Sequence, residues 1–515
     1  MAADCRKQIY SEEYLDYIAE YFLDDEYGSE IDEPCYNLAS NRFVVVYKEG
    51  DSYLRDTYIG VKIIPYCYGL LSSDQILEAT GIFRVRNRSG LELFGSGVLV
   101  GFIDTGIDYT HPAFIGSDGK SRILDIWDQT IENPGEGDLV PVFGYGVEYN
   151  NKKINEALNS SEPLSIVPSR DEIGHGTFLA GVACGSGDVE KDFDGVAPLA
   201  SICVVKCKQA KQNLKDHFFI ATDSPCYAEN DIMLGVRYLY QKARKYNMPL
   251  VICLGMGTNQ GGHNIGGILG EMLQEYGDYR GIFMVASTGN EANASHHYKS
   301  NALSEGENVE VEIRVDEKES GFSTELWTNA TDLYSVGIIS PDGEYSGKTE
   351  ARLGERRQIR FLFENTIIYI EYLLNSYENG DECIRIRFSN ISGGTWKIRV
   401  FNDNSYSSRF DMWLPMKEFL MGDTYFLRPD PDTTICEPAN NEGIITCAFY
   451  NSLNRGIVAE SGRGFTRVDD IKPDFAAPGV NVYGPLRFIG NYPKNAEERK
   501  EYARYGFKTG ASMSA

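Results

Sequence analysis

The sequence has no long hydrophobic run and no secretory signal. No window approaches the roughly 18 consecutive apolar residues that a membrane-spanning helix needs. The N-terminal residues MAADCRKQIYSEEYLDYIAEYF lack the basic segment and following apolar segment of a signal peptide. We therefore expect a protein that works inside a cell or a cell-derived compartment and has no membrane partner.

Positive charge is scarce. The 49 Lys and Arg residues face 75 Asp and Glu residues, which gives a formal net charge of -26. Such a polyanion repels nucleic acids and anionic lipid surfaces, so we expect neither as a partner. The one dense basic run, from Lys206 to Lys215, has acidic flanks, and we interpret it as a solvated face.

The 11 cysteines are odd in number and scattered, and they form no CxxC pair or Cys/His cluster. This pattern favours buried thiols in a reducing compartment over a disulfide framework or a zinc site. The adjacent His296 and His297 would point apart on any regular element, so we interpret them as a solvated loop. No acidic cluster has EF-hand spacing, and we expect no metal or other cofactor.

A chain of 515 residues exceeds one ordinary hydrophobic core. Residues 1–71 resemble a small α+β unit, in which segment 12–23 (EEYLDYIAEYFL) has the apolar spacing of a helix. The segments RFVVVY (42–47) and IGVKIIPY (59–66) predict strands. This unit would be marginally stable alone.

Short apolar runs alternate with helical patterns after residue 97. The runs are VLVGFI (98–103), ICVVK (202–206), LVICL (250–254) and IFMVA (282–286). They are typical of buried parallel strands, and segments 231–244 and 268–276 have helical periodicity. The sequence therefore predicts an α/β fold with a parallel sheet flanked by helices.

Between residues 301 and 435 the helical patterns vanish. Alternating segments such as VEVEIRV, CIRIRFS and WKIRVF are separated by turn sequences, which predicts an antiparallel, jelly-roll-like β-sandwich. The α/β pattern resumes in 436–515, so the sandwich is predicted to be an insertion that divides the α/β domain into 72–300 and 436–515. We expect it to stabilise its host, and a docking role is the alternative.

Four polar residues follow small or apolar segments in a pattern that suits acyl transfer. Asp104 ends a predicted strand, His175 opens a helical pattern, and Ser512 follows a glycine. A nucleophile, a base and an acid that orients the base are the groups such chemistry needs. Asn290, after another strand, offers an amide donor for a tetrahedral oxyanion beside the backbone N–H of Ser512.

These motifs resemble those of the subtilase family, whose chain order is Asp, His, Ser. The matching segments are IDTGID (103–108), GHGTFLAG (174–181), STGNE (287–291) and GASMSA (510–515), supported by DGVAPLA (194–200) and by 462–480. The resemblance covers roughly 80–300 and 436–515. It implies a subtilisin-like fold and a serine endopeptidase that acts on protein or peptide substrates.

The resemblance also assigns roles. Ser512 would attack the carbonyl, His175 would act as base and then acid, Asp104 would orient it, and Asn290 would stabilise the oxyanion. The segment ICLGMG (252–257) resembles the strand that forms the primary specificity pocket. Gly255, Met256 and Gly257 would therefore bind substrate by strand pairing.

A narrower resemblance is to the Csp-type germination proteases of anaerobic spore-formers. It rests on SEEYLDYI (11–18), EATGIFRVRN (78–87) and the β insertion after Asn290. It implies activation of a spore-cortex hydrolase zymogen by a cytoplasmic or spore-associated protein. Some members are pseudoproteases, so a sensor with an unusable triad is the alternative.

The subtilase resemblance implies that residues 1–71 are a prodomain, a folding aid and inhibitor, whose end PYCYGLL (65–71) would lie along Gly255–Gly257. Two features depart from the family. Ala511 stands where the family has Thr, and the family's serine opens a long buried helix, whereas Ala515 is the last residue here. Either the sequence is part of a longer chain, or the molecule lacks a core element and is inactive.

Overall fold

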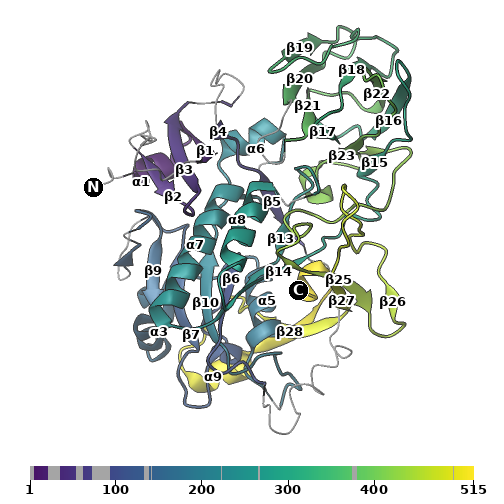
Figure 1. Cartoon of the computed structure of the whole chain (residues 1–515). Coiled ribbons are helices and arrows are strands. Elements are labelled where there is room, and N and C mark those ends of the chain that lie inside the picture. The colour runs from purple at the N-terminus through teal and green to yellow at the C-terminus, as the bar shows by residue number, and fades with distance from the viewer. Residues whose placement is uncertain are drawn as a thin grey trace.

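The computed structural model describes residues 5–20, 35–50, 52–53, 62–71, 93–132, 138–140, 142–188, 190–221, 223–264, 267–373, 380–490 and 492–515. Segment 78–87, used above for the narrower resemblance, lies outside these residues. Figure 1 shows a small N-terminal unit and a β-domain, both packed against a central α/β domain.

A 10-stranded sheet forms the centre of the α/β domain. Its order is β26-β25-β14-β12-β6-β10-β7-β9-β8, and β27 pairs with β25. The strands are β6 (Leu99–Asp104), β7 (Ile123–Asp128), β8 (Asp138–Leu139), β9 (Val147–Asn150), β10 (Ser201–Lys206), β12 (Leu250–Leu254), β14 (Ile282–Ser287), β25 (Ile445–Asn451), β26 (Gly456–Ile457) and β27 (Phe475–Pro478). The central strands β14, β12, β6, β10 and β7 pair in parallel. The apolar runs predicted all of these strands except β7.

Helices cover both faces of this sheet. Successive residues of a strand point to opposite faces, so neighbouring residues contact helices on opposite sides. On β10, Cys203 and Val205 pack in one apolar cluster with α7 (Glu229–Tyr246) and α8 (Gly267–Gly277). Ile202 and Val204 pack in another with α5 (His175–Cys184). Helix α7 approaches β6 so closely that a Cβ on Gly101 would lie 2.6 Å from Leu239 Cδ1.

Shorter elements surround the core of the α/β domain. They are η1 (Pro112–Phe114), α3 (Asn151–Leu158), α4 (Pro163–Ile166), α6 (Gln212–Phe218), α9 (Ala496–Tyr502), η3 (Ala511–Met513) and the antiparallel pair of β28 (Val482–Leu486) and β29 (Arg504–Lys508). A separate three-stranded sheet joins β5 (Cys67–Leu70) to β11 (Tyr227–Ala228) and β13 (Met256–Gly257). It links the N-terminal unit to the α/β domain.

The N-terminal unit contains α1 (Arg6–Tyr10) and a four-stranded sheet of order β2-β3-β1-β4. Its strands are β1 (Tyr14–Glu20), β2 (Tyr36–Leu38), β3 (Phe43–Glu49) and β4 (Lys62–Ile63). The helix predicted over 12–23 is therefore wrong for residues 14–20. Strand β1 is buried on both faces and pairs with β3, so its nearly continuous apolar residues fit a helical and an extended pattern equally well.

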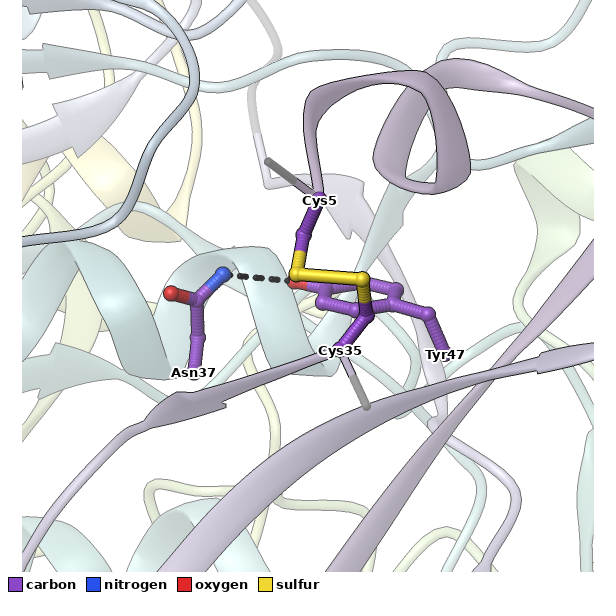
Figure 2. Close-up of a disulfide and its surroundings, with 4 residues drawn as sticks. All are labelled: Cys5, Cys35, Asn37 and Tyr47. Carbon is purple, nitrogen blue, oxygen red and sulfur yellow. Dashed lines mark hydrogen bonds between the residues drawn. A yellow bond between two sulfur atoms is a disulfide. The ribbon is translucent and has the colours of Figure 1, made fainter. Parts of the chain in front are cut away.

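One disulfide corrects the prediction that all cysteines are thiols. Cys5 and Cys35 are bonded and join the start of α1 to the start of β2. Figure 2 shows the bond beside the hydrogen bond from Asn37 Nδ2 to Tyr47 Oη. The other nine cysteines are all buried. Sequence spacing could not pair Cys5 with Cys35, because only the fold brings them together.

The basic run 206–215 is not a solvated face, because its lysines are buried and paired. The partners are Glu172 for Lys206, Asp231 for Lys208, Asp16 for Lys211 and the Ser224 carbonyl for Lys215. Lys211 Nζ lies 2.5 Å from Asp16 Oδ1 and also donates to the carbonyls of Gln8 and Tyr14. Lys211 therefore attaches the N-terminal unit to the α/β domain through buried charge, whereas the other three lysines pair within the α/β domain.

The β-domain consists of two antiparallel sheets packed face to face around one apolar core, as the alternating segments predicted. One sheet has the order β15-β23-β17-β21-β20-β19 and the other β18-β22-β16-β24. The strands are β15 (His297–Lys299), β16 (Asn308–Val315), β17 (Gly321–Thr328), β18 (Tyr334–Ile339), β19 (Arg356–Arg360), β20 (Ile367–Leu373), β21 (Glu382–Ser389), β22 (Gly394–Asn402), β23 (Asp411–Trp413) and β24 (Tyr425–Phe426).

The histidine pair belongs to this domain boundary and not to a solvated loop. His296 and His297 are both buried. His296 Nδ1 lies 2.7 Å from Glu291 Oε2, and His297 Nε2 lies 3.0 Å from Asp411 Oδ1. The two rings contact different carboxylates, so the side chains of His296 and His297 point apart, as expected. Both are nevertheless buried in protein and not exposed to solvent.

We expect Lys211→Ala to lower the free energy of unfolding by about 3 kcal/mol or more, because it leaves the Asp16 carboxylate buried without its cation. Denaturant unfolding measures the loss. Lys397→Ala is the control, since Lys397 pairs with Glu310 at the surface and its removal should have little effect. Equal losses in the two variants would contradict the role given to the buried pair.

Candidate active site

Three of the predicted residues meet at one place. Asp104 ends β6, His175 opens α5 and Ser512 lies in η3. All three are buried, and His175 Nδ1 lies 2.7 and 2.9 Å from the two carboxylate oxygens of Asp104. An ideal Cβ on Gly255 would lie 2.9 Å from His175 Cε1 and 3.2 Å from Ser512 Oγ. Only glycine leaves room for both groups at position 255.

A carboxylate that sequence reasoning missed holds the His175 region in place. Asp171 is fully buried, and its Oδ2 accepts from the backbone N–H of Thr177, 2.8 Å away, and from the Thr177 hydroxyl. Its Oδ1 accepts from the Thr105 hydroxyl, 2.8 Å away. Asp171 therefore fixes the first turn of α5 to the residue that follows Asp104. The sequence signal that could have identified Asp171 is its position four residues before His175.

A peptide strand from the N-terminal unit lies beside these residues. We call Cys67–Leu71 the tail; it comprises β5 and the next residue. The tail pairs antiparallel with β11 on one edge and with β13 on the other, where Met256 is opposite Leu70 and Gly257 is opposite Gly69. Figure 1 shows β5 beside β13. Met256 and Gly257, predicted to bind substrate, thus bind a strand of the same chain.

The tail ends with the Leu71 carbonyl group at Ser512. The backbone N–H of Ser512 donates to Leu71 O over 3.0 Å, and the Leu71 N–H donates to Gly255 O over 3.1 Å. Ser512 Oγ lies 2.8 Å from Leu71 O and 2.8 Å from Gly255 O. Among the described residues, His175 Nε2 has no hydrogen-bond partner. The serine hydroxyl is thus directed at the two carbonyls and not at the imidazole.

Asn290 lies in the loop after β14 and contacts Ala511, the residue before Ser512. Its side chain is half-buried, and its Oδ1 accepts a hydrogen bond from the backbone N–H of Ala511, 3.1 Å away. The NH₂ end of the amide is therefore turned away from Ala511. Ala511 takes its place in η3 with its side chain buried, so the small residue at this position keeps the turn.

The Leu71 side chain is fully buried in a pocket. A Cβ on Gly257 would lie 3.1 Å from Leu71 Cδ1 and 2.9 Å from Cys436 Cβ. A Cβ on Gly289 would collide with Cys436 Sγ. Gly257 and Cys436 therefore line the pocket, and burial raises the pKa of the Cys436 thiol. Sequence reasoning missed Cys436, because it is remote in sequence from every motif.

Two buried carboxyl groups hold the surroundings of the tail. Glu229 Oε2 accepts from Tyr66 N and Oε1 from Leu269 N, each over 3.0 Å, and burial raises its pKa to about 7. Glu437 Oε1 accepts from His263 N over 2.7 Å, and burial raises its pKa to about 8. Because His263 is in the loop after β13, Glu437 fixes the end of one tail-binding strand.

Three other polar residues have structural contacts of their own. His111 is buried, its Nδ1 accepts from Ala113 N, and burial lowers its pKa to about 4. The Asp108 carboxylate accepts from Phe488 N and from Thr110. Asp474 Oδ2 accepts from Thr446 N and pairs with Lys472. None of these three contacts Ser512 or Leu71.

Within the described ranges, no group of three or more His, Cys, Asp or Glu residues is placed to hold a metal ion. The same residues include no helix long and apolar enough to span a bilayer.

A comparison with protein families matches residues 95–351 to the subtilase family. The structure is similar to that of the Clostridium perfringens CspB protease, with a TM-score of 0.69 and 32% sequence identity over 84% of this chain and 83% of that one. The chain belongs to the subtilase family. The Arabidopsis thaliana subtilisin-like proteases SBT2.2 and SBT2.3 are 34% and 33% identical to this subtilase over 136 and 131 residues. These alignments span only 15% of each plant protein.

We expect Glu437→Gln to change how the stability of this subtilase depends on pH. Burial raises the pKa of Glu437 from 4.5 to about 8 in the folded state. Its stabilising contribution is therefore fully present below pH 4.5 and is lost as the pH rises toward 8. Between pH 6 and 8, the wild type should lose about 2 kcal/mol of unfolding free energy relative to Glu437→Gln.

Denaturant unfolding at a series of pH values measures this difference. Groups that titrate in the same way in both proteins contribute equally to both unfolding free energies and cancel in the difference. The exposed Glu442, five residues away, provides the control Glu442→Gln, whose profile should follow the wild type. Parallel profiles for wild type and Glu437→Gln would show that Glu437 does not carry the effect.

Proposed function

We propose that this subtilase is a serine endopeptidase, with Ser512 as nucleophile, His175 as general base and acid, Asp104 as the group that orients it and Asn290 as oxyanion donor. The observation that supports this most strongly is the tail, whose Leu71 carbonyl oxygen accepts from Ser512 N. A peptide carbonyl is held at the nucleophile by strand pairing on both edges.

In the proposed reaction, Ser512 Oγ attacks the carbonyl carbon while His175 Nε2 takes the hydroxyl proton. The negative charge that develops on the carbonyl oxygen is stabilised by Ser512 N–H and by the NH₂ group of Asn290. His175 then gives its proton to the departing amine, which leaves an acyl-enzyme. Water, deprotonated by His175, hydrolyses the acyl-enzyme and regenerates Ser512. Asp104 accepts from His175 Nδ1 throughout, which stabilises the imidazolium.

We propose further that residues 1–71 are the prodomain, 72–300 and 436–515 the catalytic domain, and 301–435 an inserted domain. The tail supports this division, because it occupies the proposed substrate position with Leu71 as its last residue at Ser512. A prodomain held in this way would inhibit the enzyme it precedes. The buried Asp16–Lys211 pair supports the same role, since it attaches the unit firmly.

We propose that the physiological substrate is the zymogen of a spore-cortex hydrolase and that the protein is cytoplasmic or spore-associated. The support is the similarity to the CspB protease along 84% of this chain. A non-cleaving sensor is the second candidate. It is favoured by the position of the Ser512 hydroxyl, which lies within 2.8 Å of two carbonyl oxygens while His175 Nε2 has no partner among the described residues.

A fluorophosphonate probe distinguishes an enzyme from a sensor, because it reacts only with an activated serine. We expect labelling of Ser512 to be slow and irreversible. It should be slow because the probe reaches Ser512 only in molecules in which the tail has moved away. Ser512→Ala should abolish labelling and His175→Ala should slow it strongly. Ser514→Ala, two residues away, should leave it unchanged. Labelling that persists in Ser512→Ala, or no labelling of the wild type, would contradict the proposed enzyme.

Asn290→Leu should lower kcat by about 100- to 1000-fold with little change in KM, as removal of such a donor does in subtilisin. The reason is that the amide interacts mainly with charge that appears in the transition state. Steady-state hydrolysis of a peptide that resembles the tail measures both constants. A variant with the kcat of the wild type would exclude Asn290 from the oxyanion site.

A further inference from the structure

The β-domain contributes side chains to the groove in which the tail lies. Its segment Met416–Phe419, which we call the strap, contains η2 (Lys417–Phe419). A Cβ on Gly69 of the tail would lie 3.3 Å from Phe419 Cζ and 3.5 Å from Met416 Cε. Met416 and Phe419 are 1% and 3% exposed and pack in the apolar core of the α/β domain.

The strap is fixed on both sides of the groove. On one side the Glu418 carbonyl accepts from Ser224 Oγ, 3.1 Å away, in the loop before β11. On the other side the backbone N–H of Lys417 donates to Glu291 Oε1 over 3.4 Å, directly after Asn290. Phe419 therefore cannot withdraw from the tail without breaking contacts to both sides of the candidate active site.

Space, and not backbone conformation, explains glycine at position 69. The φ angle of Gly69 is not in the left-handed region, so its backbone suits any residue. A methyl group at Gly69 would meet Phe419 at a tight 3.3 Å. Each further carbon would extend into the ring, and forcing such a group into a packed region is unfavourable.

We propose that Met416 and Phe419 form a subsite that selects glycine as the third residue before the cleaved bond, with alanine tolerated less well and larger residues disfavoured most. This inference rests on the proposed peptidase function. Together with the pocket around the Leu71 side chain, it gives the substrate class: extended peptides that contain Gly-Xaa-Leu immediately before the cleaved bond. The inserted domain thereby takes part in peptide selection in addition to stabilising its host.

A peptide panel tests the subsite. Fluorogenic peptides carry PYCYGLL followed by SSDQI, the sequence after Leu71, with Gly, Ala or Val at the position of Gly69. We expect kcat/KM of the wild type to be about 10- to 100-fold higher for the Gly peptide than for the Val peptide, with the Ala peptide between them.

Phe419→Ala should reduce the Gly-to-Val ratio of kcat/KM toward 1. Phe410→Ala, which removes an equally buried ring from the core of the sandwich, is the matched control and should keep the wild-type ratio. Equal kcat/KM for the Gly and Val peptides in the wild type would overturn the proposal, as would an unchanged ratio in Phe419→Ala.

A double-mutant cycle tests the same contact without catalysis, in chains that carry Ser512→Ala so that the tail stays attached. Gly69→Val should lower the midpoint of thermal unfolding, and the loss should be smaller when Phe419 is replaced by Ala. Equal losses in both backgrounds would overturn the subsite. If no peptide is cleaved, the proposed function fails, and the cycle still decides whether Phe419 limits position 69.

Discussion

Strand pairing of Cys67–Leu71 between β11 and β13 joins the three parts of the molecule. The N-terminal unit supplies the tail, the α/β domain supplies both neighbouring strands, and the β-domain places Phe419 against Gly69. Glu229 reinforces the pairing because its backbone N–H and its carboxylate both bind Tyr66. Peptide binding by backbone hydrogen bonds needs these edges in register, since the register decides which carbonyl reaches Ser512.

The proposed chemistry depends on buried polar groups that satisfy one another. Asp104, His175 and Asp171 are all inaccessible to solvent, and each finds its partners in β6, in α5, or in the residues that directly follow β6 or precede α5. In such a region of low dielectric, an oriented donor or carboxylate has more influence on a developing charge than it would have in water. Glycine at 255 permits the close approach of His175 and Ser512 that this arrangement needs.

Most of the site residues and strands that could be predicted from sequence were identified from local motifs. The ends of buried strands located Asp104 and Asn290, and the apolar runs located β6, β10, β12 and β14, because parallel strands buried on both faces are continuous in composition. The β1 segment was misassigned because a strand buried on both faces lacks the alternation of apolar and polar residues that distinguishes a strand from a helix. Other features depend on partners far away in sequence, which spacing alone does not reveal. They are the buried lysines of 206–215, the Cys5–Cys35 bond, and the contacts of Cys436 and Phe419 with the groove that holds the tail.

The most direct measurement is the intact mass of the purified chain after incubation, together with the N-terminal sequence of each fragment. The position of the Leu71 carbonyl at Ser512 predicts one cut, between Leu71 and Ser72, that yields two fragments which remain associated on gel filtration. The chain with Ser512→Ala should stay uncut under the same conditions. A cut at another bond, or the same cut in pure Ser512→Ala protein, would contradict self-cleavage by this site.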